Sequence, residues 1–480
     1  MSHTYDVAII GAGVVGASIA RELSRYRLSV ALLEKEAEPA FGVSKSNSGI
    51  IHPGTQHPAS SLKARLCVQG NLLVRTIARD LGVDFKEVGE LIVAFSEDEA
   101  LQLLSIKKEA EKIGVPGLKM VSRVWLHKHE PNLNSKAVAA LLAPTAGIIS
   151  PYRLAYDLIE NALKNSVELF SDTRVESVGA QGDLFEILTT QGSFRSRYLV
   201  NAAGLFADTV AKMLGIGDIE ITPRKGEEFL LDKKLAGLSS HLLFPIPTKT
   251  SKGVLIIKTA DGNPMIGPTA QDTEDKGDLS TSDKGLEQVL LSARKLIPSI
   301  DASNIIAYFA GLRPVAGEDF IVRLEGKMPR CVTVAGIQSP GLTASPAIAI
   351  LVRELLIRSG LEFQKKSRFY AHRKKTTHLF SLSSAKIART IKKDHAYGDM
   401  VCRCEMVSSR EIKDAISRGA KTLDGVKFRT RAQAGRCHGG FCTTRILKLL
   451  ATELTQPVTA VSKRGKGSEL IAIDKKDSSR

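Results

Sequence analysis

The sequence predicts a protein of mixed α/β and α+β class, and three features of the chain lead to that prediction. Residues 5–10 and 28–33 read as buried strands, and residues 15–26 between them have helical spacing, so a complete βαβ unit opens the chain. The middle of the chain mixes alternating strands with helical stretches. Four cysteines lie within residues 402–442, in a short segment with helical patterning. We therefore expect an N-terminal α/β domain, a middle region of mixed strands and helices, and a small helical C-terminal module.

The composition is that of a globular protein with a basic excess. The 480 residues are 43% hydrophobic and 25% charged, the length suits two or three domains, and the net charge is +16. The basic residues are not interleaved with aromatic ones and form no nucleic-acid motif, so we expect no nucleic-acid partner. An anionic substrate or an acidic partner would suit the excess. The sequence has neither an apolar run of 18 residues nor a signal-peptide pattern, so we expect a cytoplasmic protein with at most peripheral contact with the inner face of the membrane.

A glycine-rich turn follows the first strand and predicts a dinucleotide site. It has the form Gly-x-Gly-x-x-Gly, with Gly11 for a tight turn, Gly13 for close approach to a pyrophosphate and Gly16 for packing of the helix on the sheet. The pyrophosphate would lie at the positive N-terminus of the helix. Glu34, at the end of the second strand, would accept hydrogen bonds from the adenosine ribose and would repel a 2′-phosphate, which argues against NADP. The domain is therefore expected to be Rossmann-like.

Two further turns bear on the choice between NAD and FAD, which share this fingerprint. Residues 200–208 form a strand that ends in small residues at Ala203 and Gly204, where the chain can pass close to a dinucleotide. Residues 335–343 follow a late strand and lead into a helix, whose N-terminal amides would suit a second group such as a flavin ring. The alternative for each is a tight turn of small residues.

Together these segments resemble the D-amino-acid-oxidase superfamily of flavoproteins, above all its FAD-dependent glycerol-3-phosphate dehydrogenases and L-2-hydroxyglutarate dehydrogenases. The resemblance covers about residues 4–360 and includes Asn47-Ser48-Gly49-Ile50-Ile51-His52 and Asp261-Gly262-Asn263-Pro264. It implies FAD buried between two domains and hydride transfer from a substrate carbon to flavin N5. The residues expected at the FAD site are Gly11, Gly13, Val15, Gly16, Glu34, Ser44, Asn47, Ser48, Gly49, Val175, Ala203, Gly204, Gly336, Gly341, Leu342 and Thr343.

The resemblance also implies domain boundaries. The oxidoreductase region spans residues 1–360. Within it, a Rossmann-like FAD-binding domain is expected at about 1–90, 145–220 and 325–360, and a β-rich substrate domain at about 91–144 and 221–324. The charged run 361–398 reads as a linker, 399–455 as the cysteine module and 456–480 as a basic tail.

His52 is the expected catalytic base. Oxidation of a carbinol needs a group that takes the hydroxyl proton, and His52 matches the histidine that the relatives place beside the flavin. The alternative is a structural histidine before Pro53. In glycerol-3-phosphate dehydrogenases this motif continues Gly-Gly-Leu-Arg-Tyr, whereas here Gln56 stands in place of the arginine. A carboxylate substrate therefore stays open beside a phosphate.

Arg313 is the expected anchor for the substrate anion, because a guanidinium can hold a carboxylate or phosphate with two hydrogen bonds. It resembles the family's substrate arginine and is predicted to follow a strand. The alternative is an ion pair with Glu318 or Asp319. Lys258 is a second candidate cation, and the alternative there is a solvated strand lysine.

The C-terminal cysteines have the pattern Cys402-x-Cys404, 32 residues, Cys437-x4-Cys442. Structural zinc sites favour Cys-x2-Cys pairs, and four thiolates are the usual ligands of a [2Fe–2S] cluster. Zinc and free thiols remain the alternatives on spacing alone. The segment resembles bacterioferritin-associated-ferredoxin-like domains, which implies a [2Fe–2S] cluster on these four cysteines.

A flavin beside a one-electron cluster predicts that electrons leave singly, to an electron-acceptor protein or a quinone-linked partner subunit rather than to oxygen. We therefore expect a dehydrogenase of a small anionic hydroxy compound, in first place sn-glycerol 3-phosphate. An L-2-hydroxyglutarate-type dehydrogenase is the enzyme alternative. A non-catalytic flavin and iron–sulfur redox subunit is the alternative of another class.

Overall fold

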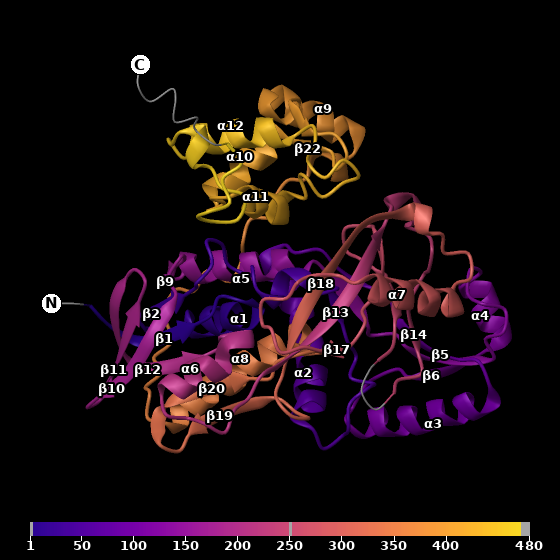
Figure 1. The fold of residues 1–480 in the computed structure, drawn as a ribbon, viewed down its shortest axis with the longest axis horizontal. Helices are drawn as coiled ribbons and strands as arrows, with labels where there is room; N and C mark the ends of the chain where they lie inside the picture. The colour runs from indigo at the N-terminus through magenta and orange to yellow at the C-terminus, as the bar shows by residue number, and fades with distance from the viewer. Residues whose placement is uncertain (1–2, 249–251, 472–480) are drawn as a thin grey trace.

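The computed structural model describes residues 3–248 and 252–471. Two sheets lie side by side in the body of the molecule, and the C-terminal module sits above them (Figure 1). This is the mixed α/β architecture that the sequence predicts.

The first sheet is built on the N-terminal βαβ unit. β1 (Thr4–Ile10) lies between β2 (Val30–Leu33) and β12 (Gly192–Asn201), and all three run parallel. The parallel set continues to β9 (Val167–Phe170) beside β2 and to β20 (Met328–Ala335) beside β12. Antiparallel strands complete the sheet: β10 (Val175–Gln181), β11 (Leu184–Thr189) and β19 (Ile321–Glu325). The carboxyl ends of the parallel strands meet at one edge, where ligands bind in open sheets of this kind.

Helices cover both faces of this sheet. One face packs against α1 (Val14–Leu23), α5 (Pro151–Lys164) and α8 (Gly341–Arg358), and the other against α6 (Ala207–Met213). Helix α2 (Leu62–Leu81) packs on α8. The strands are buried on both sides, which explains their continuous apolar runs. Helix α8 begins at Gly341, in the turn that the sequence places before the helix.

The second sheet forms the expected β-rich domain. Its order is β17-β13-β16-β15-β14-β5-β7-β6, with β18 paired along β13. The strands are β5 (Glu90–Ala94), β6 (Lys119–Ser122), β7 (Ala139–Ala143), β13 (Thr222–Leu231), β14 (Leu242–Pro245), β15 (Leu255–Lys258), β16 (Pro264–Gly267), β17 (Gln271–Asp272) and β18 (Ile305–Val315). Helices α3 (Glu97–Lys112), α4 (Arg123–His129) and α7 (Asp283–Leu296) flank it. A small third sheet has the order β3 (Ile50–Ile51), β8 (Gly147–Ile149), β4 (Phe85–Glu87). Its strands come from segments where the chain passes between the two domains.

The C-terminal module is a small helical unit, as predicted. It contains β21 (Met400–Cys402), β22 (Val407–Ser408), α10 (Ser409–Ser417), α11 (Leu423–Thr430) and α12 (Thr443–Glu453), which share one apolar core. Ser408 and Glu411 form the capping box that the spacing Ser-x-x-Glu predicts, and Thr422 caps α11. By residue type Thr443 is also predicted to cap a helix, and this prediction is wrong, because Thr443 is the first residue of α12 and its hydroxyl donates to the carbonyl of Gly439 at 2.7 Å.

The segments that flank the module are more ordered than the sequence indicates. The predicted linker contains α9 (Ser384–Lys393), so it is not a bare connection. The first part of the basic tail also packs on the module: Val461 is buried, and Ser462 forms a β-bridge with Glu469. The rest of that tail, from residue 472, lies outside the described residues. Among the helices that the structure describes, none has the length and apolarity needed to cross a membrane.

Candidate active site

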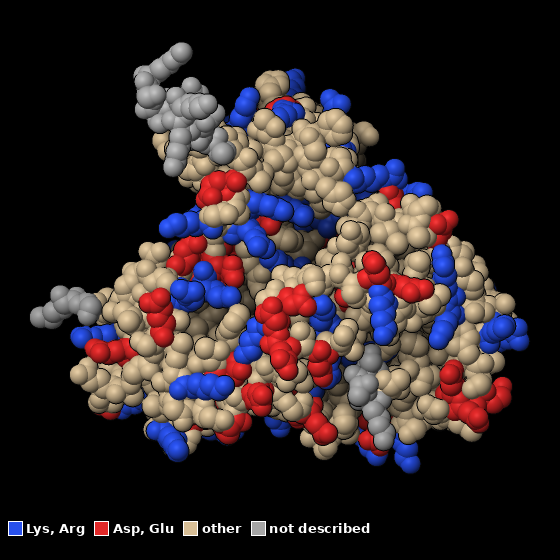
Figure 2. Space-filling model, in the orientation of Figure 1, with Lys and Arg blue, Asp and Glu red and all other residues tan. Residues whose placement is uncertain are grey.

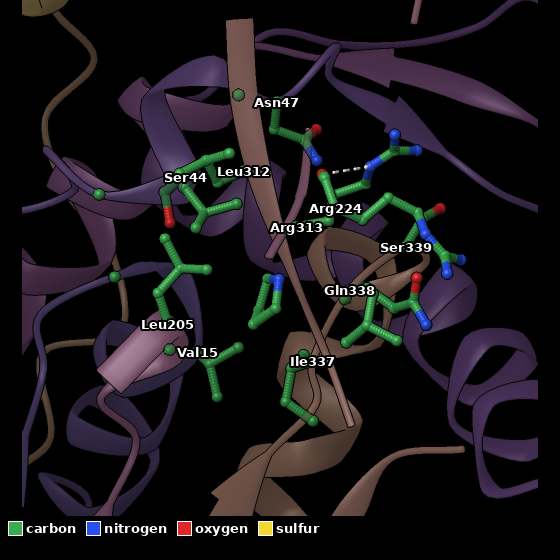
Figure 3. Close-up of a pocket in the computed structure, with 18 of the residues that line it drawn as sticks. Val15, Ser44, Asn47, Leu205, Arg224, Leu312, Arg313, Ile337, Gln338 and Ser339 are labelled. Carbon is green, nitrogen blue, oxygen red and sulfur yellow. Dashed lines mark hydrogen bonds between the residues drawn. The ribbon is translucent and has the colours of Figure 1, made fainter. Parts of the chain in front are cut away.

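A large cavity opens at the carboxyl ends of the parallel strands and continues under the second sheet. Its volume is about 1530 Å³, larger than the roughly 300–1,000 Å³ of drug-sized pockets and therefore roomy enough for a dinucleotide and a substrate. Figure 3 shows Val15, Ser44 and Leu205 on one side of this space, and Arg313, Gln338 and Ser339 on the other.

The glycines of the fingerprint turn stand where the chain leaves little room for a side chain. A Cβ on Gly16 would lie 1.9 Å from the carbonyl oxygen of Gly11, so only glycine allows α1 to pack this closely. Gly11 has a φ of +103° and passes against the end of β12, where its own Cβ would lie 2.5 Å from Ala202 O. Gly13 caps α1 without a side-chain hydrogen bond, and the hydroxyl of Ser44 accepts from Val14 N at 2.9 Å. The N-terminus of α1 thus faces the cavity.

Glu34 lies where the ribose contact is expected. Its carboxylate accepts from Ala12 N at 2.8 Å and from Glu36 N at 3.0 Å, and the residue lines the cavity. Burial raises its pKa. Gly341 and Leu342, which begin α8, line the same cavity, so two helix N-termini converge on it.

Most of the predicted site residues meet at this cavity. Those on its wall are Gly11, Gly13, Val15, Glu34, Ser44, Asn47, Ser48, Val175, Ala203, Gly204, Gly341 and Leu342, together with His52 and Arg313. Gly16, Gly49, Gly336 and Thr343 lie behind this wall, and Lys258 lies at the end of β15 away from it. Thr343 still bears on the site, because its Oγ1 accepts from His52 N at 2.9 Å.

His52 is held at the substrate end of the cavity. Its backbone carbonyl accepts from Asn71 Nδ2 at 2.9 Å, and Nε2 lies 3.3 Å from Ser339 Oγ. Burial, and then the charge of Lys252, hold the pKa of His52 well below its ordinary value. The imidazole is therefore neutral near pH 7, as a general base must be.

Glu90, at the start of β5, faces the other nitrogen of this imidazole. Its Oε2 lies 3.8 Å from His52 Nδ1, and its Oε1 accepts from the Thr55 hydroxyl. Burial raises the pKa of Glu90 to about 7. Since the imidazole is neutral, this contact is polar rather than an ion pair.

Lys252, rather than the predicted Lys258, lies on the wall of the cavity. Its ammonium donates to Ser339 Oγ at 3.3 Å, and desolvation lowers its pKa to about 8. It forms no ion pair within residues 3–248 and 252–471. The two lysines lie six positions apart, and Lys258 is at the far end of β15.

Arg313 lies within β18, not after a strand, and is not paired with Glu318 or Asp319. Its guanidinium donates to Thr269 O at 2.5 Å and to carbonyls of β13, and burial lowers its pKa to about 10. Glu228, also on the wall, has a pKa raised by burial to about 8. Asp319 instead accepts from the backbone amides of Leu62 and Lys63.

Gln56 and His57 carry buried polar atoms that are unpaired among the described residues. Both amide atoms of Gln56 and the Nε2 of His57 are buried, line the cavity and have no hydrogen-bond partner in the described part of the chain. An unpaired buried polar group costs roughly 1–3 kcal/mol. The site therefore suits a polar ligand that would satisfy these atoms.

The four module cysteines form two pairs. Cys404 Sγ lies 3.5 Å from Cys437 Sγ, and a hydrogen bond links Cys402 to Cys442. Two pairs suit a two-iron cluster, in which each iron takes two thiolates. The amides of Gly439 and Phe441 donate to Cys437, and such hydrogen bonds to a ligand sulfur tune a bound metal centre.

Fold, cavity and cysteine module together define a flavoprotein oxidoreductase with an attached iron–sulfur domain. The chain belongs to the FAD-dependent oxidoreductase family, whose model matches residues 6–355, and residues 400–452 match the BFD-like [2Fe–2S] binding domain. Its cofactors are FAD and a [2Fe–2S] cluster.

Three relatives are informative. The chain is 39% identical over 470 residues to a glycerol 3-phosphate dehydrogenase of Caloramator mitchellensis, covering 97% of this chain and 98% of the relative. A reduced, FAD-bound L-α-glycerophosphate oxidase from Mycoplasma pneumoniae superposes with a TM-score of 0.74 at 31% identity, covering 77% of this chain and 98% of the oxidase. Human mitochondrial L-2-hydroxyglutarate dehydrogenase is 30% identical over 286 residues, covering 56% of this chain and 61% of the relative.

Proposed function

We propose that the chain oxidises sn-glycerol 3-phosphate to dihydroxyacetone phosphate and passes the electrons through the [2Fe–2S] cluster to an acceptor other than oxygen. The observation that carries the substrate class is the gathering of cations beside His52. Lys63, Arg224, Lys252 and Arg313 all line the same end of the cavity. Arg224 is already paired with Asp272, at 2.6 and 2.9 Å, which leaves Lys252 and Arg313 as the stronger candidates for a substrate anion.

Each residue has a role in this reaction. His52 takes the proton of the substrate hydroxyl as hydride leaves the same carbon, and bound FAD supplies the hydride acceptor. Glu90 orients the imidazole. Lys252 and Arg313 hold the phosphate, and the Gln56 amide donates to it in place of the arginine that the sequence lacks at this position.

The parts of this chain that the two relatives match support the proposed electron acceptor. The dehydrogenase is matched along nearly its whole length, as is this chain. The oxidase is also matched almost completely, but by only 77% of this chain, which is too little to span the FAD region and the iron–sulfur domain together. The iron–sulfur domain thus accompanies the relative named a dehydrogenase. We propose an electron-acceptor protein or quinone-linked partner, met in the cytoplasm or at the inner face of the membrane.

A second substrate, L-2-hydroxyglutarate, is favoured by one observation. Gln56 is an amide, and a neutral donor suits a carboxylate as readily as a phosphate. The relative of that name is matched over a smaller part of both chains, so glycerol 3-phosphate remains first.

The test compares both substrates and both kinds of acceptor on the holoenzyme. Turnover with glycerol 3-phosphate is expected to yield dihydroxyacetone phosphate and to run faster with ferricenium than with oxygen. Turnover with L-2-hydroxyglutarate alone would move the enzyme to the other substrate. Oxygen turnover equal to or faster than that with ferricenium would overturn the proposed acceptor.

A further inference from the structure

The iron–sulfur module is fixed to the body by a cluster of buried charges that the substrate chemistry does not use. The body contributes Tyr152 at the start of α5, and Asp261 and Asn263 in the loop between β15 and β16. The module contributes Arg431 after α11 and Glu405 beside Cys404. Figure 2 shows Lys and Arg side chains gathered along this boundary, around a hollow under the module.

Arg431 is the centre of this cluster. Its Nη1 lies 3.2 Å from Tyr152 Oη and 3.4 Å from Asp261 Oδ2, and its Nη2 donates to Asn263 Oδ1 at 2.9 Å. Its Nε donates to Glu405 Oε2 at 3.3 Å, within the module. The side chain is only 13% exposed, so these contacts are shielded from solvent. The planar guanidinium reaches both sides of the boundary at once.

Residues next to Cys404 and residues next to Cys437 both contact the body of the molecule. Glu405, which follows Cys404, also accepts from Lys233 Nζ of the body at 2.7 Å. On the other side of the cysteine pair, Arg436 pairs with Asp232, and His438 Nε2 donates to Ile306 O at 2.6 Å. Both residues neighbour Cys437 in sequence. The Cys404–Cys437 pair is therefore held against the body from two directions.

The backbone of Arg431 supports this role. It has a φ of +73°, a left-handed conformation that costs a residue with a side chain and persists where its surroundings hold it. A second anchor lies nearby: Glu38 of the body pairs with Arg429 at 2.8 Å and accepts from Lys421 N and Thr422 N. Contacts at both ends of α11 therefore hold the module on the body.

We propose that Arg431 is a positioning residue that sets the distance and orientation of the [2Fe–2S] cluster relative to the flavin, so that electrons pass between the two cofactors within one chain. With both cofactors bound, the cluster held in this position would take one electron from reduced flavin, one Fe(III) becoming Fe(II). The second electron would follow once an external one-electron acceptor had reoxidised the cluster. The proposal deepens the proposed function and rests on its electron path, but not on the substrate.

The test reduces the flavin of the anaerobic holoenzyme by light with a sacrificial donor, without substrate, and follows the cluster by its electron paramagnetic resonance signal. Arg431→Met is expected to slow cluster reduction several-fold, because the iron–sulfur cluster is no longer held at one distance from the flavin and the rate of electron transfer falls as that distance grows. Arg431→Lys is expected to restore part of the rate, because an ammonium can pair with Asp261 but cannot also reach Glu405. Arg445→Ala is the matched control, since its ion pair with Asp399 lies within the module.

Asp261→Asn weakens the contacts of Arg431 from the body side and changes no residue of the cysteine loops. It is therefore informative even if Arg431→Met loses its iron. Hydrogen exchange of residues 258–264 is expected to rise in both variants and to be unchanged in the control. Cluster reduction within twofold of the wild type in Asp261→Asn, with unchanged exchange, would overturn the proposal. Failure of glycerol 3-phosphate to reduce the flavin, with light-driven transfer still dependent on Arg431, would reject the proposed substrate alone.

Discussion

His52 Nδ1 lies 3.8 Å from Glu90 Oε2, an oxygen without a hydrogen-bond partner in the described part of the chain. The carboxylate can therefore stabilise the imidazole once it takes a proton, and it is the ionised form of Glu90 that does so. With its pKa raised to about 7, Glu90 ionises as the pH rises through neutrality.

Replacing Glu90 by Gln should therefore remove a rise in activity across neutral pH. Wild-type kcat/KM is expected to increase through about pH 7 as Glu90 ionises, whereas Glu90→Gln, which mimics the protonated acid, should stay low and flat there. In His52→Ala, kcat/KM should fall roughly 10²–10⁴-fold, which is the usual contribution of a general base. Flavin reduction rates over a pH series measure both. An unchanged profile in Glu90→Gln would exclude a role for this carboxyl.

Lys252 should set the alkaline limit of the enzyme. Its ammonium is charged below its pKa of about 8 and neutral above it, so binding of an anionic substrate should weaken as the pH rises through that value. In Lys252→Arg the limit should move to higher pH, because a guanidinium stays charged. The pH profile of kcat/KM, which reports the free enzyme, provides the measurement. A limit at the same pH in Lys252→Arg would assign it to another group.

Gln56→Leu should weaken substrate binding without slowing the chemical step. The variant removes the two unpaired amide atoms at the cavity wall and keeps a side chain of similar size. A hydrogen bond to a charged group contributes roughly 1.5–3 kcal/mol, so KM should rise roughly 10- to 100-fold. Steady-state kinetics separate KM from kcat. A fall in kcat at constant KM would place Gln56 in contact with the reacting atoms instead.

Cys437→Ser should separate the two cofactors. The variant is expected to lose the [2Fe–2S] cluster and keep FAD, because the flavin cavity contains no residue of the module. Substrate should still bleach the flavin, while turnover with ferricenium should fall. Iron analysis and visible spectra check the two halves of this prediction. Loss of FAD together with iron would show that the module supports the flavin site.

Local patterns account for much of this site. The βαβ unit, the Gly11–Gly16 turn and the paired cysteines depend on residues close in sequence, which is why the sequence predicts them. His52 and Arg313 were predicted through the family resemblance, and the structure places both on the cavity.

The rest depends on contacts between distant segments. Lys252 lies in a loop without a periodic pattern, so the sequence gives no sign that it, rather than Lys258, faces the cavity. Glu90 could have been suspected, since a carboxylate that opens the apolar strand Leu91–Ala94 needs a partner. Arg431 contacts Asn263 and Tyr152, which lie 168 and 279 residues earlier in the chain. No local pattern in the sequence marks these contacts.

The most direct test of the account is an anaerobic titration of the holoenzyme with glycerol 3-phosphate, followed by visible and electron paramagnetic resonance spectra. FAD takes two electrons and the cluster one, so the account predicts bleaching of the flavin and reduction of the cluster that end at roughly 1.5 equivalents of substrate. An end point at one equivalent with an oxidised cluster, or no bleaching at all, would contradict it.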